Sequence, residues 1–396
     1  MISHYGLWRE VLLLVATAPF AYYTLATLAA LRFFGRNQPQ TPAGYTPPAS
    51  LFKPVRGVDF ASYENFVSFC KLDYPEYEIL FAVNDENDPA LPLIRKIMAE
   101  FPQKKIRLFT SAEELGANRK VNKLAMLARE AQYDVLVLTD GDVRVDPDYL
   151  RDVVAPLRDK KVGAVTSFYR AIAQDNFGAK LEAIGAVSDF FAGVLMARWK
   201  EGIRFALGAS IATTKDWVRK MGGFEVIADA LADDYELGLR IANAGGEIVL
   251  LREPVWTMYP AQTFSGFWDH QLRWARTVSL CRPLSYLGLL FTQGLPWTVL
   301  AVLFAPTVWI ASAHVAGYLV LRLAMAWTVG VWGVKDKVLP QHFWLVPIRD
   351  AIYFVVWLAS FGSNRIRWGA EEYTIHERRM VPIAPRAKTV VESADH

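Results

Sequence analysis

Short apolar runs alternate with amphipathic segments from residue 51 to about residue 254. The predicted strands are Leu51–Phe52, Glu78–Val83, Ile106–Phe109, Val135–Leu138, Ala164–Phe168, Ala206–Ala212 and Glu247–Leu251. The predicted helices are Ala61–Cys70, Pro89–Glu100, Lys120–Ala131, Pro147–Leu157, Gly178–Ala197, Lys215–Met221 and Ala230–Ala244. Strands that alternate with helices in this way predict an α/β fold, with a mostly parallel sheet covered by helices.

A long apolar run precedes this region. Val11–Leu31 carries no charge, and about 20 apolar residues are enough to cross a bilayer. Arg32 and Arg36 follow the run, so the positive-inside rule places the α/β region in the cytoplasm. A cleaved signal peptide is the alternative, but its basic flank would stand before the apolar stretch and not after it.

Two further apolar blocks follow the α/β region. Leu284–Val334 is long enough for two crossings of a bilayer. His342–Phe361 carries Arg349 and Asp350, a charge pair that is costly at bilayer depth, so this block is interfacial, re-entrant or packed against the other segments. The arginine-rich tail indicates a cytoplasmic end, and we therefore favour an arrangement in which one segment does not cross.

The chain divides by composition into five parts. They are a membrane anchor at 1–36, a proline-rich polar linker at 37–50, a cytosolic α/β domain at 51–282, a membrane region at 283–362 and a cytosolic tail at 363–396. Hydrophobic residues make up 53% of the chain and charged residues 21%, which fits a soluble domain with membrane segments attached. A net charge of +3 is too weak to indicate a nucleic-acid partner. Two cysteines cannot make a disulfide framework.

Two carboxylates follow the predicted strand Val135–Leu138. Asp140 and Asp142 flank Gly141, which lets the backbone turn tightly. Ligands of α/β sheets lie beyond the carboxyl ends of the strands, and two carboxylates there can share Mg²⁺ or Mn²⁺, which in turn binds phosphates. A solvated turn is the plain alternative.

Other polar groups stand at neighbouring strand ends and helix starts. Asp85 can accept hydrogen bonds from a nucleoside or can form an Asx turn. Lys53 and Arg56 suit a phosphate-bearing ligand or a solvated basic loop. Lys120 opens a helix, where a cation is unfavourable for the helix dipole unless an anionic ligand binds.

Asp233 and Asp234 open the predicted helix Ala230–Ala244. They can complement the helix dipole, or one of them can act as a general base. A carboxylate beside another carboxylate has a raised pKa, as a base that works near neutral pH requires.

A last group of polar and aromatic residues lies before the second membrane region. His270, Arg273 and Trp274 share one face if their segment is helical. Arg273 can hold a diphosphate, and Trp274 can pack on a sugar or anchor the helix at the membrane surface. An amphipathic interfacial helix is the alternative.

Taken together, the motifs resemble membrane-bound, inverting glycosyltransferases of the GT-A fold. The nearest resemblance is to ceramide glucosyltransferases of glycosyltransferase family 21 and their bacterial relatives, including those of hopanoid synthesis. It rests on the segments Lys53–Asp59, Leu72–Ile79, Val83–Ala90, Lys120–Leu124, Asp140–Asp142, Asp233–Tyr235 and Arg273–Trp274. The resemblance implies a Rossmann-like nucleotide-sugar domain with transmembrane helices on both sides.

The resemblance also implies roles for individual residues. Asp85 would hold the uridine, Asp140 and Asp142 the metal and the UDP diphosphate, and Asp234 would be the base. The family's (Gln/Arg)-x-x-Arg-Trp signature has His270 at its first position here, with the glutamine one place later.

The implied activity is transfer of a hexose from a UDP-sugar, with UDP-glucose favoured, to a lipid hydroxyl such as that of ceramide. The transfer would occur at the cytoplasmic face of a membrane, which we expect to be a bacterial inner membrane. One alternative is transfer of N-acetylglucosamine from its UDP-sugar to a hopanoid polyol. A second alternative, a non-catalytic membrane scaffold, predicts broken carboxylate positions, whereas all of these carboxylates are present.

Overall fold

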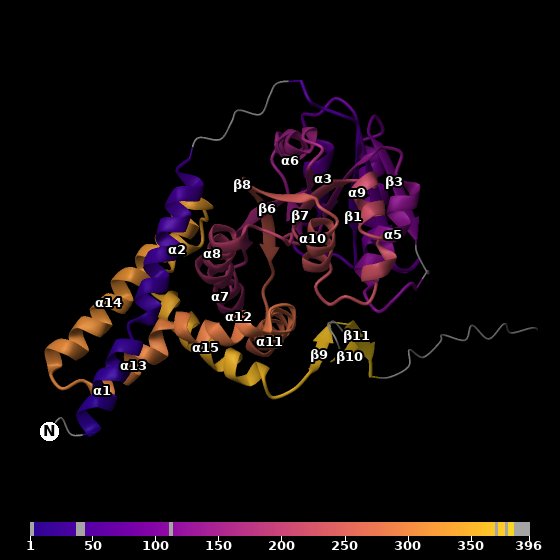
Figure 1. The fold of residues 1–396 in the computed structure, drawn as a ribbon. Coiled ribbons are helices and arrows are strands. Elements are labelled where there is room, and N and C mark those ends of the chain that lie inside the picture. Colours follow the sequence, from indigo (N-terminus) through magenta and orange to yellow (C-terminus); the bar gives the residue numbers. More distant parts are fainter. Residues whose placement is uncertain (1–3, 37–43, 111–113, 369–370, 377–378, 384–396) are drawn as a thin grey trace, which may run out of the picture.

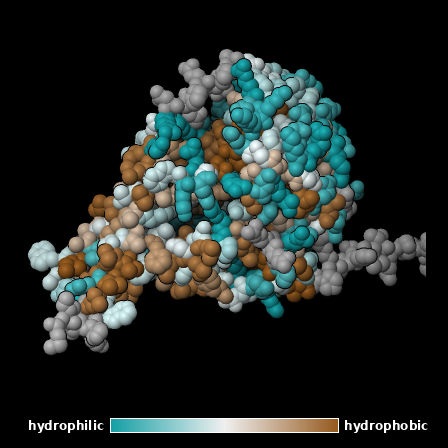
Figure 2. Space-filling model, viewed as in Figure 1, coloured by the Kyte–Doolittle hydropathy of each residue, from teal (hydrophilic) through white to brown (hydrophobic). Residues whose placement is uncertain are grey.

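The computed structural model describes residues 4–36, 44–110, 114–368, 371–376 and 379–383. Residues 37–43 of the predicted linker and residues 384–396 of the predicted tail lie outside this part. An α/β domain has a group of long apolar helices on one side and a small separate sheet on the other (Figure 1). Hydrophobic residues gather over α1, α13 and α14, whereas hydrophilic residues cover much of the α/β domain (Figure 2).

Eight strands form the central sheet in the order β3-β2-β1-β4-β7-β6-β8-β5. They are β1 (Ala49–Pro54), β2 (Tyr77–Val83), β3 (Lys105–Thr110), β4 (Val135–Thr139), β5 (Val143–Arg144), β6 (Val162–Ala173), β7 (Ser210–Thr214) and β8 (Glu247–Tyr259). The strands β3, β2, β1 and β4 run parallel, as do β6 and β8, while β7 is antiparallel to both of its neighbours. The predicted α/β fold with a mostly parallel sheet is confirmed.

Helices cover both faces of this sheet. They are α3 (Ser62–Cys70), α4 (Ala90–Glu100), α5 (Arg119–Glu130), α6 (Tyr149–Val154), α9 (Lys215–Lys220) and α10 (Asp233–Asn243). Alternate strand residues belong to two separate cores, because Leu51 packs with α3 and α4 while Phe52 packs with α5 and α10. Every residue of β1, β2 and β4 is therefore buried, as their continuous apolar sequence requires.

One predicted strand is displaced. The strand expected at Ala206–Ala212 begins only at Ser210. Leu207 instead uses both its N–H and its carbonyl for hydrogen bonds with the hydroxyl of Thr166, at 2.9 and 3.1 Å. Gly208 therefore lies in the loop that precedes β7 and not in a strand.

The remaining helices form the apolar part of the molecule. They are α1 (His4–Val15), α2 (Ala18–Phe34), α7 (Phe177–Gly185), α8 (Phe191–Glu201), α11 (Phe264–Cys281), α12 (Pro283–Gly288), α13 (Gly294–Phe304), α14 (Val308–Ala326) and α15 (Leu345–Ser360). A π-helical segment, η2 (Ala186–Phe190), joins α7 to α8, and a second, η5 (Trp327–Gly333), extends α14.

Two helical stretches are long and apolar enough to cross a membrane, within the described part of the chain. They are Leu7–Phe34 and Val308–Gly333. A third crossing is possible if Pro283–Thr292 and Gly294–Phe304, which are bent by 46° relative to each other, act as one span.

The charged helix α15 is packed against other segments. Asp350 accepts a hydrogen bond from Arg322 of α14 at 2.8 Å, and Arg322 also reaches Asp189 of η2 at 2.6 Å. Arg349 donates to the side-chain oxygen of Gln271 on α11 at 2.7 Å. Arg322 and Asp350 are therefore paired within the protein, whereas Arg349 contacts a neutral amide.

A three-stranded sheet that the sequence did not predict lies near the C-terminus. It consists of β9 (Arg365–Trp368), β10 (Glu371–His376) and β11 (Arg379–Pro382). Its buried face packs on Ala117 and Leu231 of the α/β domain, and the Met380 N–H donates to the carbonyl of Asp229 at 2.8 Å. This part of the tail is thus attached to the α/β domain.

Candidate active site

One lysine joins the carboxyl end of β4 to the starts of two helices. The Lys120 ammonium lies 2.6 Å from a carboxylate oxygen of Asp140 and 3.2 Å from one of Asp233. Lys120 stands in the first turn of α5 because Asn118 caps that helix and accepts hydrogen bonds from the N–H groups of Lys120 and Val121. Burial favours the neutral amine, but the charges of Asp140 and Asp233 outweigh it and raise the Lys120 pKa.

Asp234 faces Asp140 across the loop before β7. A Cβ atom built on Gly208 would lie 3.0 Å from an oxygen of Asp234 and 3.6 Å from one of Asp140. Both carboxylates therefore approach the same point of backbone, where a side chain would crowd them. Burial and then the charge of Asp233 raise the pKa of Asp234 to about 6, while Lys120 opposes the shift.

Asp142 is held on the other side of Gly141. Its carbonyl accepts a hydrogen bond from the Met258 N–H at 3.2 Å, next to the pairing of β5 with β8. Burial and the charge of Asp140 raise the pKa of the Asp142 carboxyl to about 7, and Lys53 opposes this shift. The predicted Asp140 and Asp142 pair is therefore a half-buried unit of two carboxylates that repel each other.

The Lys53 side chain contacts the backbone of the turn between Asp140 and Asp142. It lies inside β1 and is fully buried, although the predicted strand ended at Phe52. Its ammonium donates to the carbonyl of Asp140 at 2.5 Å and lies 4.1 Å from the centre of the Phe69 ring. Burial lowers the pKa of Lys53 to about 7, against the charges of Asp142 and Asp140.

Asp85 and Arg56 lie apart from this cluster. Both are exposed, and no contact within the described residues joins either of them to Lys120 or Asp140. The Asp85 carboxylate accepts from the Asn87 N–H at 2.8 Å, which is the Asx turn. The loops that carry Asp85 and Arg56 are nevertheless tied together, because Asp88 accepts from the N–H of Gly57 at 2.9 Å.

On the predicted face of α11, the His270 side chain already contacts other protein groups through both of its ring nitrogens. The His270 Nδ1 atom lies 2.6 Å from Glu182 on α7, and its Nε2 atom accepts from the Trp274 indole at 2.9 Å. Neither ring nitrogen of His270 is then left to donate to a phosphate in this arrangement. Burial lowers the pKa of Arg273 to about 10, and the nearby Glu182 opposes that shift.

The sequence missed residues that lie between the carboxylates and α11. Tyr169 on β6 is buried, and after burial the charges of Asp234, Glu182 and Asp142 raise the pKa of its phenol further above its usual value. Tyr169 and Glu182 stand in a buried strand and in an apolar helix, where sequence gives no signal that separates them from core residues.

The donor chemistry of Asp140 and Asp142 fits a divalent cation. Carboxylate oxygens are hard ligands that Mg²⁺ and Mn²⁺ prefer, and a cation would relieve the repulsion that raises the pKa of Asp142. In the part of the chain that the structure describes, no group of three or more acidic, histidine or cysteine side chains is assembled for a metal. Mg²⁺ commonly takes one or two protein carboxylates together with substrate phosphates, so two such ligands are sufficient.

The fold is similar to that of GT-A glycosyltransferases. A mannosyltransferase from Pyrobaculum calidifontis, solved in complex with GDP-Man and Mn²⁺, superposes with a TM-score of 0.55 over 89% of this chain and 98% of its own, at 18% sequence identity. The chain belongs to glycosyl transferase family 21, whose sequence profile matches residues 11–381. The predicted fold and family are therefore both confirmed.

Curated relatives of the chain are ceramide glucosyltransferases. Ceramide glucosyltransferase 3 of Caenorhabditis elegans is 26% identical over 231 residues, which is 58% of this chain and 50% of that protein. The Candida albicans ceramide glucosyltransferase is 32% identical over 123 residues, or 27% of this chain and 22% of that protein. The matches span about half the length of the nematode relative and less of the yeast one.

Proposed function

We propose that this protein is an inverting glycosyltransferase that moves a hexose from a UDP-sugar, with UDP-glucose favoured, to a hydroxyl group of a membrane lipid such as ceramide. Residues 51–282 would form the catalytic domain at the cytoplasmic face of the membrane. Residues 1–36 and 283–362 would hold that domain at the lipid surface. The family membership and the names of the relatives support this choice of substrates.

One observation carries the proposal. The carboxylates of Asp140, Asp233 and Asp234 meet around Lys120 and Gly208, although they come from two separate parts of the chain. Asp142 adds a fourth carboxylate, which is half-buried beside Asp140. A site of this composition matches a sugar nucleotide whose diphosphate is bound together with a divalent cation.

Asp234 is the proposed base. With a pKa raised to about 6, its carboxylate is mostly ionised near neutral pH and can accept a proton from an alcohol as that alcohol attacks. The acceptor oxygen would bond to the anomeric carbon from the side opposite UDP, so the configuration at that carbon inverts. Gly208 leaves the space beside Asp234 in which the acceptor hydroxyl would lie.

Asp140 and Asp142 would hold the divalent cation, Mg²⁺ or Mn²⁺. Such an ion stabilises the negative charge that develops on the leaving diphosphate. Lys120 fixes the position of Asp140 and Asp233, and Lys53 fixes the backbone of the Asp140 turn. Asp85 and Arg56 would meet the nucleoside at the rim of the sheet, and Arg273 with Trp274 would close the opposite side.

His270 would act as a positioning residue. Its two hydrogen bonds join Glu182 of α7 to Trp274 of α11, so His270 fixes the helix that carries Arg273.

Product analysis tests the proposed reaction. The purified full-length protein is incubated with Mn²⁺, with UDP-glucose or UDP-N-acetylglucosamine as the donor and ceramide or a hopanoid polyol as the acceptor, and the lipid product is identified by mass spectrometry and NMR. We expect a β-linked glucosyl lipid from the α-linked donor. A product only from N-acetylglucosamine and a hopanoid polyol would change the donor and acceptor, and no release of UDP with any lipid would exclude the transferase.

A further inference from the structure

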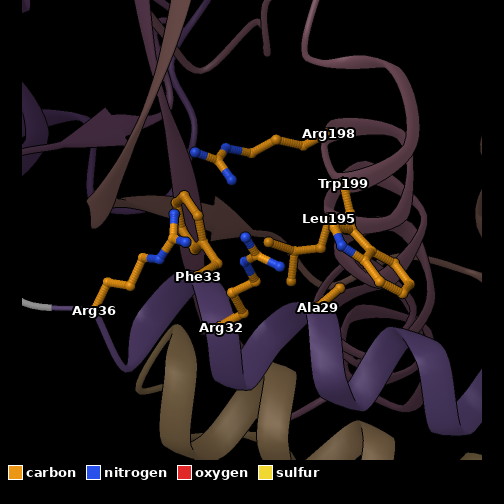
Figure 3. A pocket seen from close by; sticks show the side chains of 7 residues that line it. All are labelled: Ala29, Arg32, Phe33, Arg36, Leu195, Arg198 and Trp199. Atoms are coloured by element: carbon orange, nitrogen blue, oxygen red, sulfur yellow. The ribbon is translucent and has the colours of Figure 1, made fainter.

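A separate pocket lies where α2 meets α8. Its volume is about 190 Å³, and it shares no residue with the carboxylate cluster. Phe33 and Leu195 form its apolar wall, and the guanidinium groups of Arg32, Arg36 and Arg198 point into the space around the Phe33 ring (Figure 3). A concave site with an apolar wall and several cations has the chemistry of an anion-binding site.

The geometry of two helices brings these arginines together. Arg32 and Arg36 are four residues apart at the end of α2, which is the spacing of neighbours on one helical face. Arg198 comes from the last turn of α8, and its guanidinium lies 4.8 Å from the centre of the Phe33 ring. A fourth arginine, Arg252 of β8, lies 5.6 Å from the same ring and donates to the carbonyl of Arg36.

The charge of this cluster is not balanced by an ion pair among the described residues. Within the described residues, no carboxylate forms an ion pair with Arg32, Arg36, Arg198 or Arg252. The acidic residue at the end of α8, Glu201, pairs with Arg282 instead. Burial and then repulsion from its arginine neighbours lower the pKa of Arg198. Four cations that crowd one aromatic ring destabilise each other unless an anion lies between them.

The pocket lies at the end of a candidate membrane span. That span covers Leu7–Phe34, so Phe33 falls in its last turn and Arg36 just beyond it. Trp199, on the rim of the pocket, is 44% exposed, and tryptophan and arginine side chains favour the headgroup level of a bilayer. Leu28, one turn before Arg32, is 51% exposed, so apolar surface continues from the pocket along α2.

We propose that this pocket binds the phosphate group of an anionic phospholipid in the leaflet next to the α/β domain. The planar guanidinium groups of Arg36 and Arg198 would bind the phosphate oxygens in pairs, and Phe33, Leu195 and Trp199 would contact the start of the acyl chains. The apolar surface along α2 favours a lipid over free phosphate. Because the ligand is an anion, it is distinct from the uncharged acceptor lipid, and the proposal does not depend on transferase activity.

Lipid binding to the detergent-solubilised full-length protein tests this site. Native mass spectrometry would count bound phosphatidylglycerol and, in parallel, bound phosphatidylcholine. We expect Arg36→Gln and Arg198→Gln each to weaken the binding of phosphatidylglycerol about fivefold, which corresponds to about 1 kcal/mol for each arginine at a membrane surface. Binding of phosphatidylcholine should not change.

Three further variants sharpen the result. Arg219→Gln on α9 is the matched control, because that arginine is 77% exposed and lies outside the pocket, and we expect it to bind like the unmodified protein. Arg36→Lys keeps the charge but loses the paired hydrogen bonds, so its loss should be smaller than that of Arg36→Gln but still measurable. Arg32→Gln, at the third arginine that lines the pocket, replaces either of the other two variants if circular dichroism shows that it does not fold.

Specific outcomes would overturn the site. Unchanged binding of phosphatidylglycerol in the folded double variant of Arg36→Gln and Arg198→Gln would exclude it. An equal loss in the Arg219→Gln control would show a diffuse charge effect and no pocket. Inorganic phosphate at the same concentration as the lipid should displace little phosphatidylglycerol, and full displacement would show a free-phosphate site in place of a lipid site.

Discussion

At the scale of single residues, Asp140 and Asp234 are ordinary carboxylates that differ in their neighbours. Lys120 lies 2.6 Å from Asp140, whereas Asp234 has Asp233 beside it in the first turn of α10. The same small region therefore holds one carboxylate paired with an ammonium and one whose pKa is raised to about 6. Two nearby carboxylates whose charged neighbours differ in this way can perform different chemical tasks.

Asp234→Asn tests the base directly. The substitution keeps the size of the side chain but removes its ability to accept a proton, so we expect the turnover number to fall about 10²–10⁴-fold. UDP binding should be nearly unchanged, as measured by isothermal titration calorimetry with Mn²⁺. The comparison variant is Asp142→Ala, which should lose metal-dependent binding of UDP. Loss of UDP binding in a folded Asp234→Asn protein would contradict the assignment of the base.

The pH dependence of the reaction rate should reflect the ionisation of Asp234. A base must be ionised, so the rate of UDP release should rise with pH through about 6 and be lost below it. Asp233→Asn removes the charge that, after burial, contributes most to the raised pKa of Asp234, and this variant should move the acidic limb to lower pH. An acidic limb that stays in place in Asp233→Asn would show that another group controls it.

At the scale of elements, the sequence predicted the strands and helices whose ends are marked by the local pattern of apolar and polar residues. Asp140, Asp142 and Asp234 were identifiable because a strand end and a helix start are marked by the residues around them. The parallel pairing of β1 with β4 then brings loops from distant parts of the chain to one edge. Lys53 was placed beyond its strand because the apolar run ends at Phe52, although the ladder continues to Pro54.

Other elements depend on contacts that no local pattern encodes. Tyr169 reaches the site only because β6 pairs with β8 far beyond its predicted end, from Val162 to Ala173. Glu182 becomes part of the site through the contact of α7 with His270 on α11. The strands β9 to β11 are short and rest on Ala117 and Leu231, so their formation depends on docking to the α/β domain.

The link between α14, α15 and η2 allows a stability prediction. Arg322→Ala would leave Asp350 and Asp189 buried without the cation that both now contact. We expect a loss of about 3–5 kcal/mol in the free energy of unfolding, as for other buried pairs that lose one partner. Thermal unfolding of the detergent-solubilised protein would measure it, with Arg219→Ala as an exposed control expected to change stability by less than about 0.5 kcal/mol. Equal unfolding temperatures for the two variants would contradict a buried ionic link.

At the scale of the whole molecule, the docked tail restricts how the chain crosses a membrane. The sheet of β9 to β11 shares a core with the α/β domain and is bonded to it at Asp229, so both lie on one side of the bilayer. The chain between α11 and β9 must then cross an even number of times. Two crossings satisfy this condition if α12 with α13 forms one bent span, α14 with η5 forms the next, and α15 does not cross.

This topology predicts opposite sides for the two ends of the described chain. Leu7–Phe34 is a single span before the α/β domain, so a tag at the N-terminus should lie across the membrane from a tag placed after Ile383. If the domain faces the cytoplasm, as the positive charges after Leu31 predict, added protease should remove the C-terminal tag from sealed inside-out vesicles and leave the N-terminal tag intact. Detergent, which opens the vesicles, is the control and should expose both tags. The same result for both tags in intact vesicles, whether removal or protection, would mean that the number of crossings between the domain and the tail is not the one that their shared core requires. Removal of the N-terminal tag alone would keep that number of crossings but reverse the orientation of the domain.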